Sequence, residues 1–392
     1  MNTIMIIAGE SSGELYGSLL AKALKRKSPE SRLIGVGGER MRDAGMELVS
    51  GTSDAFGLIE ALSAIPKIKI AFRKTIDAME ESKPDVIVLI DYPDFNLRIA
   101  EKAKSLGIKR LYYVSPQVWA WRKGRVKKIA SLVDRMAVVL PFEENIYRHV
   151  GLTCEFVGHP MLEEIENVLG TDLREKRDES RKSLRVALGF DMERPLLSLL
   201  PGSRPSELGR HLPLMTEVVR KFKSGTGGKA GRDCQFCMPL APNTDQDKYA
   251  SYLEAIRNEG VSVMKGESVR ALGASDLAVV ASGTATLQTA LLEVPMVVIY
   301  RLSPMTYSLG KRIIKVKYIS LVNLLADREV VVELIQKRAN PEEITGELEK
   351  MLLDEKYREE MICHLREIKA PFLGRKASER VAEIAMEMAG IR

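Results

Sequence analysis

Residues 3–14 read Thr3-Ile-Met-Ile-Ile-Ala8-Gly9-Glu10-Ser11-Ser12-Gly13-Glu14. An apolar run with the length of a buried strand leads directly into a turn that is rich in glycine and serine. A helical pattern follows over residues 15–25. A buried strand that passes through a glycine turn into a helix predicts the first step of an α/β fold with a parallel sheet.

The alternation of strand and helix continues along the chain. In the first half, apolar runs predict strands at 3–8, 32–36, 86–90, 110–114 and 135–140. In the second half, they predict strands at 196–200, 235–240, 261–264, 277–280 and 296–300. Helical stretches such as 98–105 separate these runs, and only helices are predicted after residue 340. Two successive sets of this kind predict two Rossmann-like, doubly wound domains that face a central cleft.

The predicted domains follow from this pattern and from one charged segment. Residues 171–185 carry few apolar side chains, so the domain boundary is placed there. We expect a first domain over 1–170 and a second over 186–340. Residues 341–392 are expected to be helices that pack back across the domains.

Composition limits the possible functions. The chain has 392 residues, 45% of them hydrophobic and 29% charged, which is typical of a soluble enzyme of about two domains. No apolar run reaches the ~18 residues of a spanning helix. The N-terminus lacks the basic region of a signal peptide, which predicts a cytoplasmic protein. The net charge of +6 fits a phosphate-bearing substrate or an anionic membrane, and it is too small to indicate nucleic acid.

Cysteine and histidine spacing argues against a metal site. Cys234 and Cys237 form a CxxC on a predicted strand, where residues three apart point to opposite faces, so buried structural thiols are favoured. The four histidines show no metal-binding spacing. Asp245 and Asp247 form a DxD at a predicted helix start, where acids favour the helix dipole. We therefore expect neither a metal nor a cofactor.

In the first domain, two loops that follow strands carry candidate polar residues. The turn after the first strand offers Glu10, Ser12 and Gly13, although a purely structural turn explains it equally well. After residues 86–90, Asp91 and Asp94 suit a general base and its partner, and Asn96 adds an amide. A capping Asp beside Pro93 accounts for one of these acids better than for both.

A third segment of the first domain runs Tyr113-Val-Ser-Pro-Gln117-Val-Trp119-Ala-Trp121-Arg122 and holds both tryptophans of the chain. Trp119 beside Gln117 indicates a face that stacks on a sugar or lines an acyl channel. Burial in a core is the alternative interpretation.

The second domain carries two candidate anion-binding loops. Leu200-Pro-Gly-Ser203-Arg204 follows one strand, and the guanidinium of Arg204 suits a diphosphate. Ser282-Gly283-Thr284 follows another strand and opens a helix that continues through Thr286 to Gln288. Each loop alone is explained equally well by a plain turn, but together they favour a nucleotide-diphosphate ligand.

Taken together, these motifs resemble the lipid-A-disaccharide synthase family, which has the two-domain GT-B architecture. The Ser115–Trp121 string and Pro93-Asp-Phe-Asn96 are the specific matches. The further matching segments span nearly the whole chain: Gly35–Gly38 with Met41, Leu140–Glu143, Val157–Pro160, Tyr300-Arg301, Leu321–Leu324 and a segment near Phe372.

The resemblance implies an inverting transfer from UDP-2,3-diacylglucosamine to 2,3-diacylglucosamine 1-phosphate, giving lipid A disaccharide 1-phosphate and UDP. It implies Asp94 as the base, with Asp91 as the alternative. The residues that it assigns to UDP-sugar binding are Ser203, Arg204, Ser282, Gly283, Thr284, Thr286 and Gln288. The residues assigned to the acceptor or the cleft are Glu10, Ser12, Gly13, Asn96, Gln117, Trp119, Arg301 and Asn323.

Two residues depart from the pattern of the family, and two other functions remain as alternatives. Glu14 and Gln288 occupy positions where the family commonly has Asp and Glu. Gln288 could still hydrogen-bond a ribose, but without charge assistance. The alternatives are a UDP-N-acetylglucosamine 2-epimerase-like enzyme and a non-catalytic nucleotide-sugar-binding protein, because the fold alone does not fix the function.

Acylated substrates require contact with a bilayer. Residues 56–74 and 311–317 mix aliphatic side chains with Lys and Arg, as interfacial segments do. An ordinary core-facing helix is the alternative for the first segment, and a cleft lining is the alternative for the second. We expect peripheral association with the inner face of the cytoplasmic membrane and leave a homodimer open.

Overall fold

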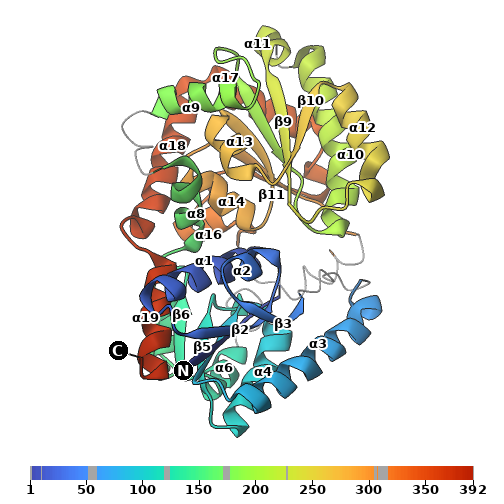
Figure 1. The fold of residues 1–392 in the computed structure, drawn as a ribbon. Coiled ribbons are helices and arrows are strands. Elements are labelled where there is room, and N and C mark those ends of the chain that lie inside the picture. The colour runs from blue at the N-terminus through green and yellow to red at the C-terminus, as the bar shows by residue number, and fades with distance from the viewer. Residues whose placement is uncertain are drawn as a thin grey trace. The chain divides into compact units, whose positions relative to one another are not determined.

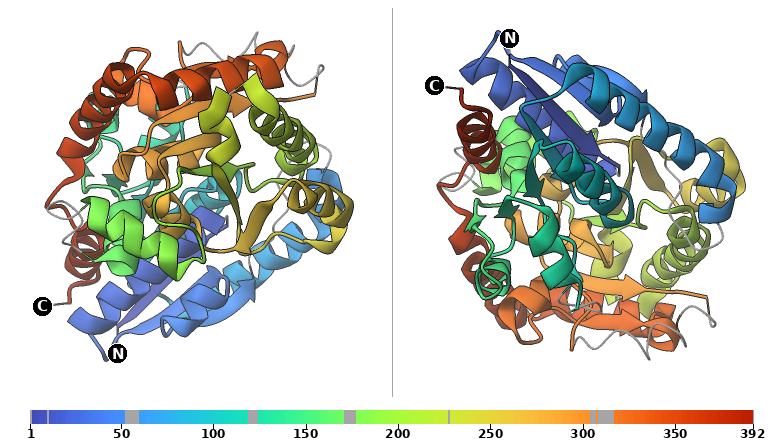
Figure 2. Two further views of the ribbon diagram at one scale, coloured as in Figure 1. Left: turned by 90° about the horizontal axis from the view of Figure 1, so that it is seen from above. Right: turned by 90° about the horizontal axis from the view of Figure 1, so that it is seen from below.

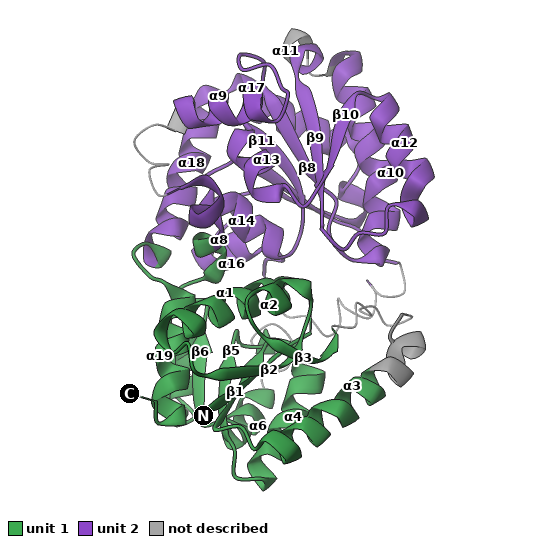
Figure 3. Cartoon of the chain, in the orientation of Figure 1, with its two compact units in different colours: residues 1–163, 372–392 green, residues 164–371 purple. Residues whose placement is uncertain are grey.

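The computed structural model describes residues 2–9, 11–51, 60–118, 124–170, 177–226, 228–303, 307 and 317–391. The chain forms two compact units (Figures 1 and 3). The first comprises residues 1–163 and 372–392, and the second comprises residues 164–371. The first unit thus ends earlier than the predicted boundary at residue 170. Of the predicted C-terminal helical segment, only residues from 372 onward belong to the first unit.

The first unit contains a seven-stranded sheet in the order β3-β2-β1-β4-β5-β6-β7, with every pair parallel. Its strands are β1 (Thr3–Ala8), β2 (Arg32–Gly37), β3 (Glu47–Gly51), β4 (Val86–Ile90), β5 (Lys109–Tyr113), β6 (Arg135–Val138) and β7 (Cys154–Phe156). Its helices are α1 (Ser11–Lys27), α2 (Glu39–Asp43), α3 (Glu60–Ser82), α4 (Pro93–Ser105), α6 (Arg125–Leu132), α7 (Glu143–Arg148) and α19 (Ala377–Ala389).

The second unit contains a six-stranded parallel sheet in the order β10-β9-β8-β11-β12-β13. Its strands are β8 (Leu196–Leu200), β9 (Gln235–Leu240), β10 (Val261–Lys265), β11 (Leu277–Ala281), β12 (Met296–Tyr300) and β13 (Glu333–Ile335). Its helices are α9 (Arg177–Ala187), α10 (Pro205–Lys221), α11 (Gly228–Asp233), α12 (Ala250–Asn258), α13 (Ser268–Ala274), α14 (Thr284–Leu291), α16 (Leu321–Ala326), α17 (Pro341–Leu353) and α18 (Glu355–Lys369). Helix α8 (Pro160–Leu169) carries the chain from the first unit into the second.

In both sheets, the same hydrogen-bonding arrangement is found at the amino ends of the central strands. Asp85 precedes β4, and its Oδ2 accepts the N–H of Thr3, the first residue of β1, at 2.8 Å. Asp276 precedes β11, and its Oδ2 accepts the N–H of Leu196, the first residue of β8, also at 2.8 Å. Both aspartates also donate their own N–H to the carbonyl of the same partner. This arrangement fixes the neighbouring strands β1 and β4, and β8 and β11, in register at their amino ends.

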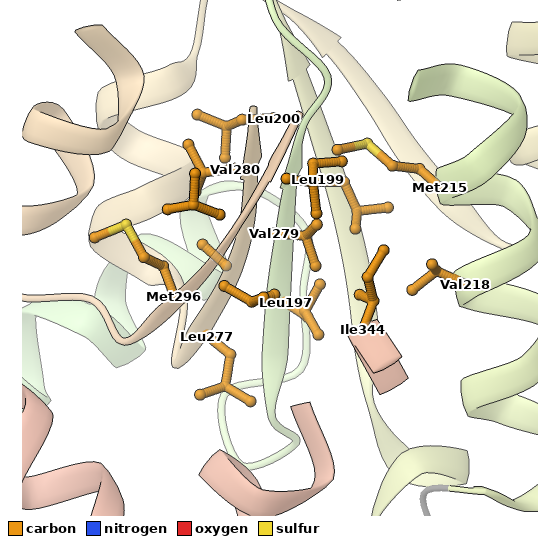
Figure 4. Close-up of a cluster of buried hydrophobic side chains, with 14 of the residues drawn as sticks. Leu197, Leu199, Leu200, Met215, Val218, Leu277, Val279, Val280, Met296 and Ile344 are labelled. Atoms are coloured by element: carbon orange, nitrogen blue, oxygen red, sulfur yellow. The ribbon is translucent and has the colours of Figure 1, made fainter. Parts of the chain in front are cut away.

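The central strands β1, β4, β8 and β11 are buried at every position, as expected for a parallel sheet covered on both faces. Figure 4 shows side chains of β8 and β11 in the second unit, with Met296 of β12 on one side and Met215 and Val218 of α10 and Ile344 of α17 on the other, all in one hydrophobic cluster. Helix α19 packs against α1 in the first unit, so the C-terminal end of the chain lies close to the N-terminal end (Figures 1 and 2).

All ten predicted strands are confirmed, with ends shifted by at most two residues. The prediction missed β3, β7 and β13. Strands β7 and β13 have three residues each, too few to show a periodicity, and β3 is only half-buried.

The thiols of the CxxC are buried, as predicted. Cys234 and Cys237 pack into different hydrophobic clusters, which follows from their positions on opposite faces. Burial raises the pKa of Cys234 to about 12 and that of Cys237 to about 11. Among the described residues, no helix combines the length and apolar character needed to cross a membrane. Among the same residues, no group of three or more side chains that could hold a metal ion is found.

The first unit buries a neutral histidine, which makes its stability depend on pH. His159 lies against the rings of Tyr16 and Phe372, and its Nδ1 accepts the N–H of Met161 at 3.1 Å. Burial lowers the pKa of His159 from 6.5 to about 3. The unfolded chain therefore binds the proton at a higher pH than the folded chain does.

The predicted consequence is a loss of stability as the pH falls from 6.5 towards 3, by up to about 1.4 kcal/mol per pH unit from this group. His159→Gln carries no titrating ring, so its free energy of unfolding should fall less steeply. Urea denaturation of both proteins between about pH 7 and about pH 5 measures the two slopes. Equal slopes would contradict a neutral, buried His159.

Candidate active site

Both sheets reverse their strand order at one position, between β1 and β4 in the first unit and between β8 and β11 in the second. In open parallel sheets, ligands bind at the carboxyl ends of the strands beside such a switch point. The loops after β1, β4, β8 and β11 contain most of the predicted site residues. The predicted residues Glu10 and Trp119 lie outside the described residues.

The loops after β1 and β4 touch through Gly9. A Cβ atom on Gly9 would lie 2.1 Å from Cδ1 of Tyr92, so the aromatic ring needs a glycine at this position. In the same first loop, Ser12 is half-buried at the start of α1 and Gly13 is buried. The Glu14 carboxylate accepts the N–H of Arg40 at 3.0 Å and thereby holds the start of α2. The Glu14 side chain thus has a structural role in the first unit.

The backbone of the loop after β4 is strained and firmly held. Asp91 and Tyr92 both adopt left-handed conformations, with φ of 46° and 47°. Asn96 is fully buried, and its Nδ2 donates to the carbonyls of Ile90 at 3.1 Å and Asp91 at 2.8 Å. The Tyr112 hydroxyl donates to the Asp91 carbonyl at 2.6 Å. Asn96 therefore supports the loop from within, rather than presenting its amide at the surface.

The two aspartates of this loop differ in environment. The Asp94 side chain is 77% exposed at the start of α4, and its Oδ1 lies 3.1 Å from Nη2 of Arg125. Asp91 is half-buried beside Tyr16. Burial raises the pKa of the Tyr16 hydroxyl above its usual range, and the nearby charge of Asp91 adds to this shift. Asp94 is therefore the more accessible of the two acids.

Beyond β5, the segment with the predicted sugar-stacking residues begins at Val114, which has a left-handed φ of 64°. Ser115 is buried, and its hydroxyl pairs with that of Tyr147 at 2.7 Å. Gln117 is exposed. The polar side chain predicted for the site is thus accessible at this edge of the first unit.

In the second unit, the loop after β8 is capped by a carboxylate. Gly202 has a left-handed φ of 103°. Oε2 of the buried Glu207 accepts the N–H groups of Ser203 at 3.1 Å and Arg204 at 3.2 Å. The backbone N–H groups of Ser203 and Arg204 are therefore already hydrogen-bonded within the protein. The Arg204 side chain is 47% exposed, and Ser203 beside it is also exposed, so both are accessible to a ligand.

The loop after β11 leaves its first residues accessible. Gly283 is exposed, and Ser282 and Thr284 are half-buried at the start of α14. The Ser282 hydroxyl donates to the carbonyl of Ile319 at 2.8 Å, which ties this loop to the start of α16. Helix α14 directs its first N–H groups towards this end, where a negative charge is favoured.

The predicted residues deeper in α14 are covered. Thr286 is fully buried and donates its hydroxyl to the carbonyl of Gly283 at 2.8 Å. Gln288 is also buried, so its side chain presents little surface to a ribose.

Arg301 and Asn323 support loops in the second unit. Nε of Arg301 donates to the carbonyl of Ala339 at 2.8 Å. Asn323 is fully buried; its Nδ2 donates to the carbonyl of Val331 and to Glu333, and its Oδ1 accepts the N–H of Val331. Both the nitrogen and the oxygen of the Asn323 amide are thus hydrogen-bonded within the protein. Asn323 therefore acts on the site through the backbone that it holds.

Two supporting residues were missed by the sequence analysis: His211 and Glu333. Glu207 follows Arg204 by three residues, a spacing typical of the acid at a helix start, and the structure places it in the first turn of α10. His211 in the middle of a helix and Glu333 in a three-residue strand give no local signal. The DxD acid Asp245 accepts the N–H of Lys248 at 3.2 Å, as a helix start requires.

Comparison with known proteins gives a match along nearly the whole chain. A sequence model of the family described as lipid-A-disaccharide synthetase matches residues 4–387. The lipid-A-disaccharide synthase of Anaeromyxobacter dehalogenans (strain 2CP-C) is 42% identical and covers 97% of this chain and 96% of its own. That of Myxococcus xanthus (strain DK1622) is 39% identical, with 98% and 97% covered.

Solved structures share the fold. The UDP-GlcNAc 2-epimerase from Neisseria meningitidis bound to UDP-GlcNAc has a TM-score of 0.67 at 11% identity and covers 99% of this chain and 100% of its own. A glycosyltransferase from Rickettsia africae ESF-5 has a TM-score of 0.55 at 12% identity, with 99% and 98% covered. At such low identity the likeness concerns the fold alone, and it confirms the predicted α/β class with two Rossmann-like sheets.

Proposed function

The chain belongs to the lipid-A-disaccharide synthase family, and we propose that it joins UDP-2,3-diacylglucosamine to 2,3-diacylglucosamine 1-phosphate with inversion at the anomeric carbon. It is a glycosyltransferase of lipid A biosynthesis, a hexosyltransferase, as its motifs predicted. The match over nearly the full length is the observation that carries the proposal. The products would be a tetraacyl disaccharide 1-phosphate and UDP.

The second unit supplies the donor site in this proposal. Arg204 offers an accessible guanidinium, which binds phosphate oxygens through paired N–H groups. Ser282, Gly283 and Thr284 lie at the positive end of α14. Negative charge grows on the diphosphate as its bond to the sugar breaks, so both features stabilise the transition state more than the ground state. Ser203, beside Arg204, is exposed and available to the same ligand.

The first unit supplies the base. Asp94 would accept the proton of the acceptor 6-hydroxyl while that oxygen attacks the anomeric carbon and UDP departs. Its exposure makes it reachable, and Arg125 orients the carboxylate. Asp91 remains the alternative base. Asn96 acts by holding the backbone carbonyls of Ile90 and Asp91, at the start of this loop.

The three buried members of the predicted set, and the half-buried Arg301, take supporting roles. Thr286 closes the first turn of α14, and Gln288 lies one turn further along the helix. Asn323 and Arg301 hold the neighbouring loops through hydrogen bonds to their backbone. We assign these four residues to the shape of the donor site rather than to direct contact with the diphosphate.

Product identity tests the function. Purified protein supplied with both diacylated sugars should release UDP and form a tetraacyl disaccharide monophosphate, which mass spectrometry identifies by its summed mass. UDP with free diacylglucosamine would indicate hydrolysis instead of transfer. Conversion of UDP-N-acetylglucosamine to its 2-epimer would support the epimerase alternative.

The base assignment predicts a specific loss of turnover. Asp94→Asn should lower kcat by ~10²-fold or more and leave UDP binding unchanged, because a general base contributes mainly to the chemical step. Glu101→Gln is the matched control, since Glu101 also lies on α4 and pairs with Lys128 of α6 at 2.9 Å, as Asp94 pairs with Arg125. The control should keep near wild-type turnover. An active Asp94→Asn beside an inactive Asp91→Asn would exchange the two roles.

Membrane contact is proposed for the described part of α3. Ile70 is 57% exposed, and its neighbours Lys69, Arg73 and Lys74 are exposed cations. On the opposite side, Phe72 meets Phe95 of α4 edge to face. An outward apolar side chain among cations suits the boundary of an anionic bilayer, which fits the inner face of the cytoplasmic membrane. Residues 56–59 and 311–316 of the two predicted segments lie outside the described residues.

Vesicle binding tests this surface. The wild-type protein should bind vesicles containing anionic lipid, and the binding should weaken as salt rises. Ile70→Glu should reduce this binding several-fold, because it adds a negative charge and removes the apolar contact. Leu353→Glu is the matched control, since Leu353 is 67% exposed on α17 of the second unit, and it should bind as wild type does. Equal binding by all three proteins would exclude α3 as the contact.

A further inference from the structure

Beyond the assigned residues, we infer that His211 is a positioning residue for the donor site, tying the loop after β8 to the loop after β12. This inference rests on the proposed UDP site in the second unit. The resemblance gave this histidine no role, and it touches none of the exposed groups proposed to bind the diphosphate.

The imidazole makes one hydrogen bond at each end. His211 lies in α10 and is fully buried. Its Nδ1 lies 2.7 Å from the carbonyl of Pro201, and its Nε2 lies 3.0 Å from the backbone N of Arg301. A carbonyl only accepts and an N–H only donates, so Nδ1 must carry the proton and Nε2 must be free to accept. The geometry therefore requires a neutral ring of one tautomer.

The surroundings of the ring favour this neutral form. Burial lowers the pKa of His211, and the charges of Arg301 and Arg210 act in the same direction. The hydrogen bond to Pro201 acts in the opposite direction; its influence is smaller than that of burial and larger than that of either arginine. The bridge is thus formed by a side chain whose two ring nitrogens match its two partners.

The strand order gives this bridge its significance. Strands β8 and β12 are not neighbours, because β11 lies between them. His211 joins the residue that follows β8 to the residue that follows β12, on either side of the loop Ser282–Thr284 that leaves β11. One side chain therefore fixes both flanks of the proposed anion loop.

Each bridged residue is connected to the site. Pro201 directly precedes Gly202, whose φ of 103° favours glycine, and the loop that carries Arg204. At the other end, the Leu302 N–H donates to Oε1 of Gln336 at 2.7 Å, so the segment that starts at Arg301 is held on its far side as well. Between the two ends, the Tyr300 ring lies 6.2 Å from the His211 ring, and the Tyr300 hydroxyl is hydrogen-bonded by Arg204.

A neighbouring polar residue shows the contrast. Thr216 is also buried in α10, but its hydroxyl donates to the carbonyl of Leu212 in the same helix, at 2.9 Å. Loss of that bond would affect the helix, whereas loss of the His211 bonds would release the two loops that flank the anion site. Thr216→Val is therefore a matched control for the loss of a buried hydrogen bond.

The test compares His211→Phe, His211→Gln and Thr216→Val in the full chain, with UDP as the calorimetric probe. His211→Phe keeps a ring but loses both bonds, and it should weaken UDP binding about tenfold or more and raise the donor KM by a similar factor. The acceptor KM should stay within about twofold of wild type. His211→Gln restores an acceptor for the Arg301 N–H, and it should recover much of the UDP affinity. Thr216→Val should bind UDP as wild type does.

Several results would overturn the inference. These are wild-type UDP affinity in His211→Phe, an equal rise in donor and acceptor KM, or an equal loss in Thr216→Val. If His211→Phe fails to fold, His211→Gln decides, since a folded Gln variant with no recovered affinity contradicts the positioning role. If the wild-type protein binds no UDP, the donor-site proposal itself fails, whereas UDP binding that is indifferent to His211 removes only the present inference.

Discussion

The parallel pairing of β1 with β4 and of β8 with β11 is the constraint on which both units depend. These strands are buried on both faces, and apart from Ser198, which is hydrogen-bonded in the middle of β8, their inner positions are apolar. The other polar groups lie at the strand ends, and the two ends take different tasks. Asp85 and Asp276 fix the register at the amino ends, while the candidate site residues follow the carboxyl ends.

Within each unit, buried polar groups hold the loops and exposed groups remain for the substrate. In the first unit, the amide of Asn96 supports a left-handed backbone turn and leaves Asp94 accessible. In the second unit, Glu207 occupies the amides of the loop after β8 and leaves the Arg204 guanidinium accessible. The proposed general base and diphosphate site would need this division, because catalysis by positioning and charge works only when the groups are held before the substrate arrives.

The sequence predicted the two sheets well because long buried strands carry a strong local signal, and it missed β7 and β13 because three residues do not. The motifs lie in loops that follow β1, β4, β8 and β11, as predicted, but they could not tell a supporting side chain from one that is accessible to a ligand. Asn323 illustrates the limit, since its amide is satisfied by residues seven and more positions away, which no local pattern reveals. The contact of Gly9 with Tyr92 likewise depends on strands that meet only in the folded sheet.

The most direct measurement is an experimental structure of the protein with UDP bound. The account predicts the diphosphate in the second unit, within hydrogen-bonding distance of the Arg204 guanidinium and of the N–H groups that begin α14, beside the switch point between β8 and β11. Asp94 should make no contact with UDP itself. A diphosphate bound by the loops of the first unit, or one that leaves Arg204 and the start of α14 untouched, would contradict the account.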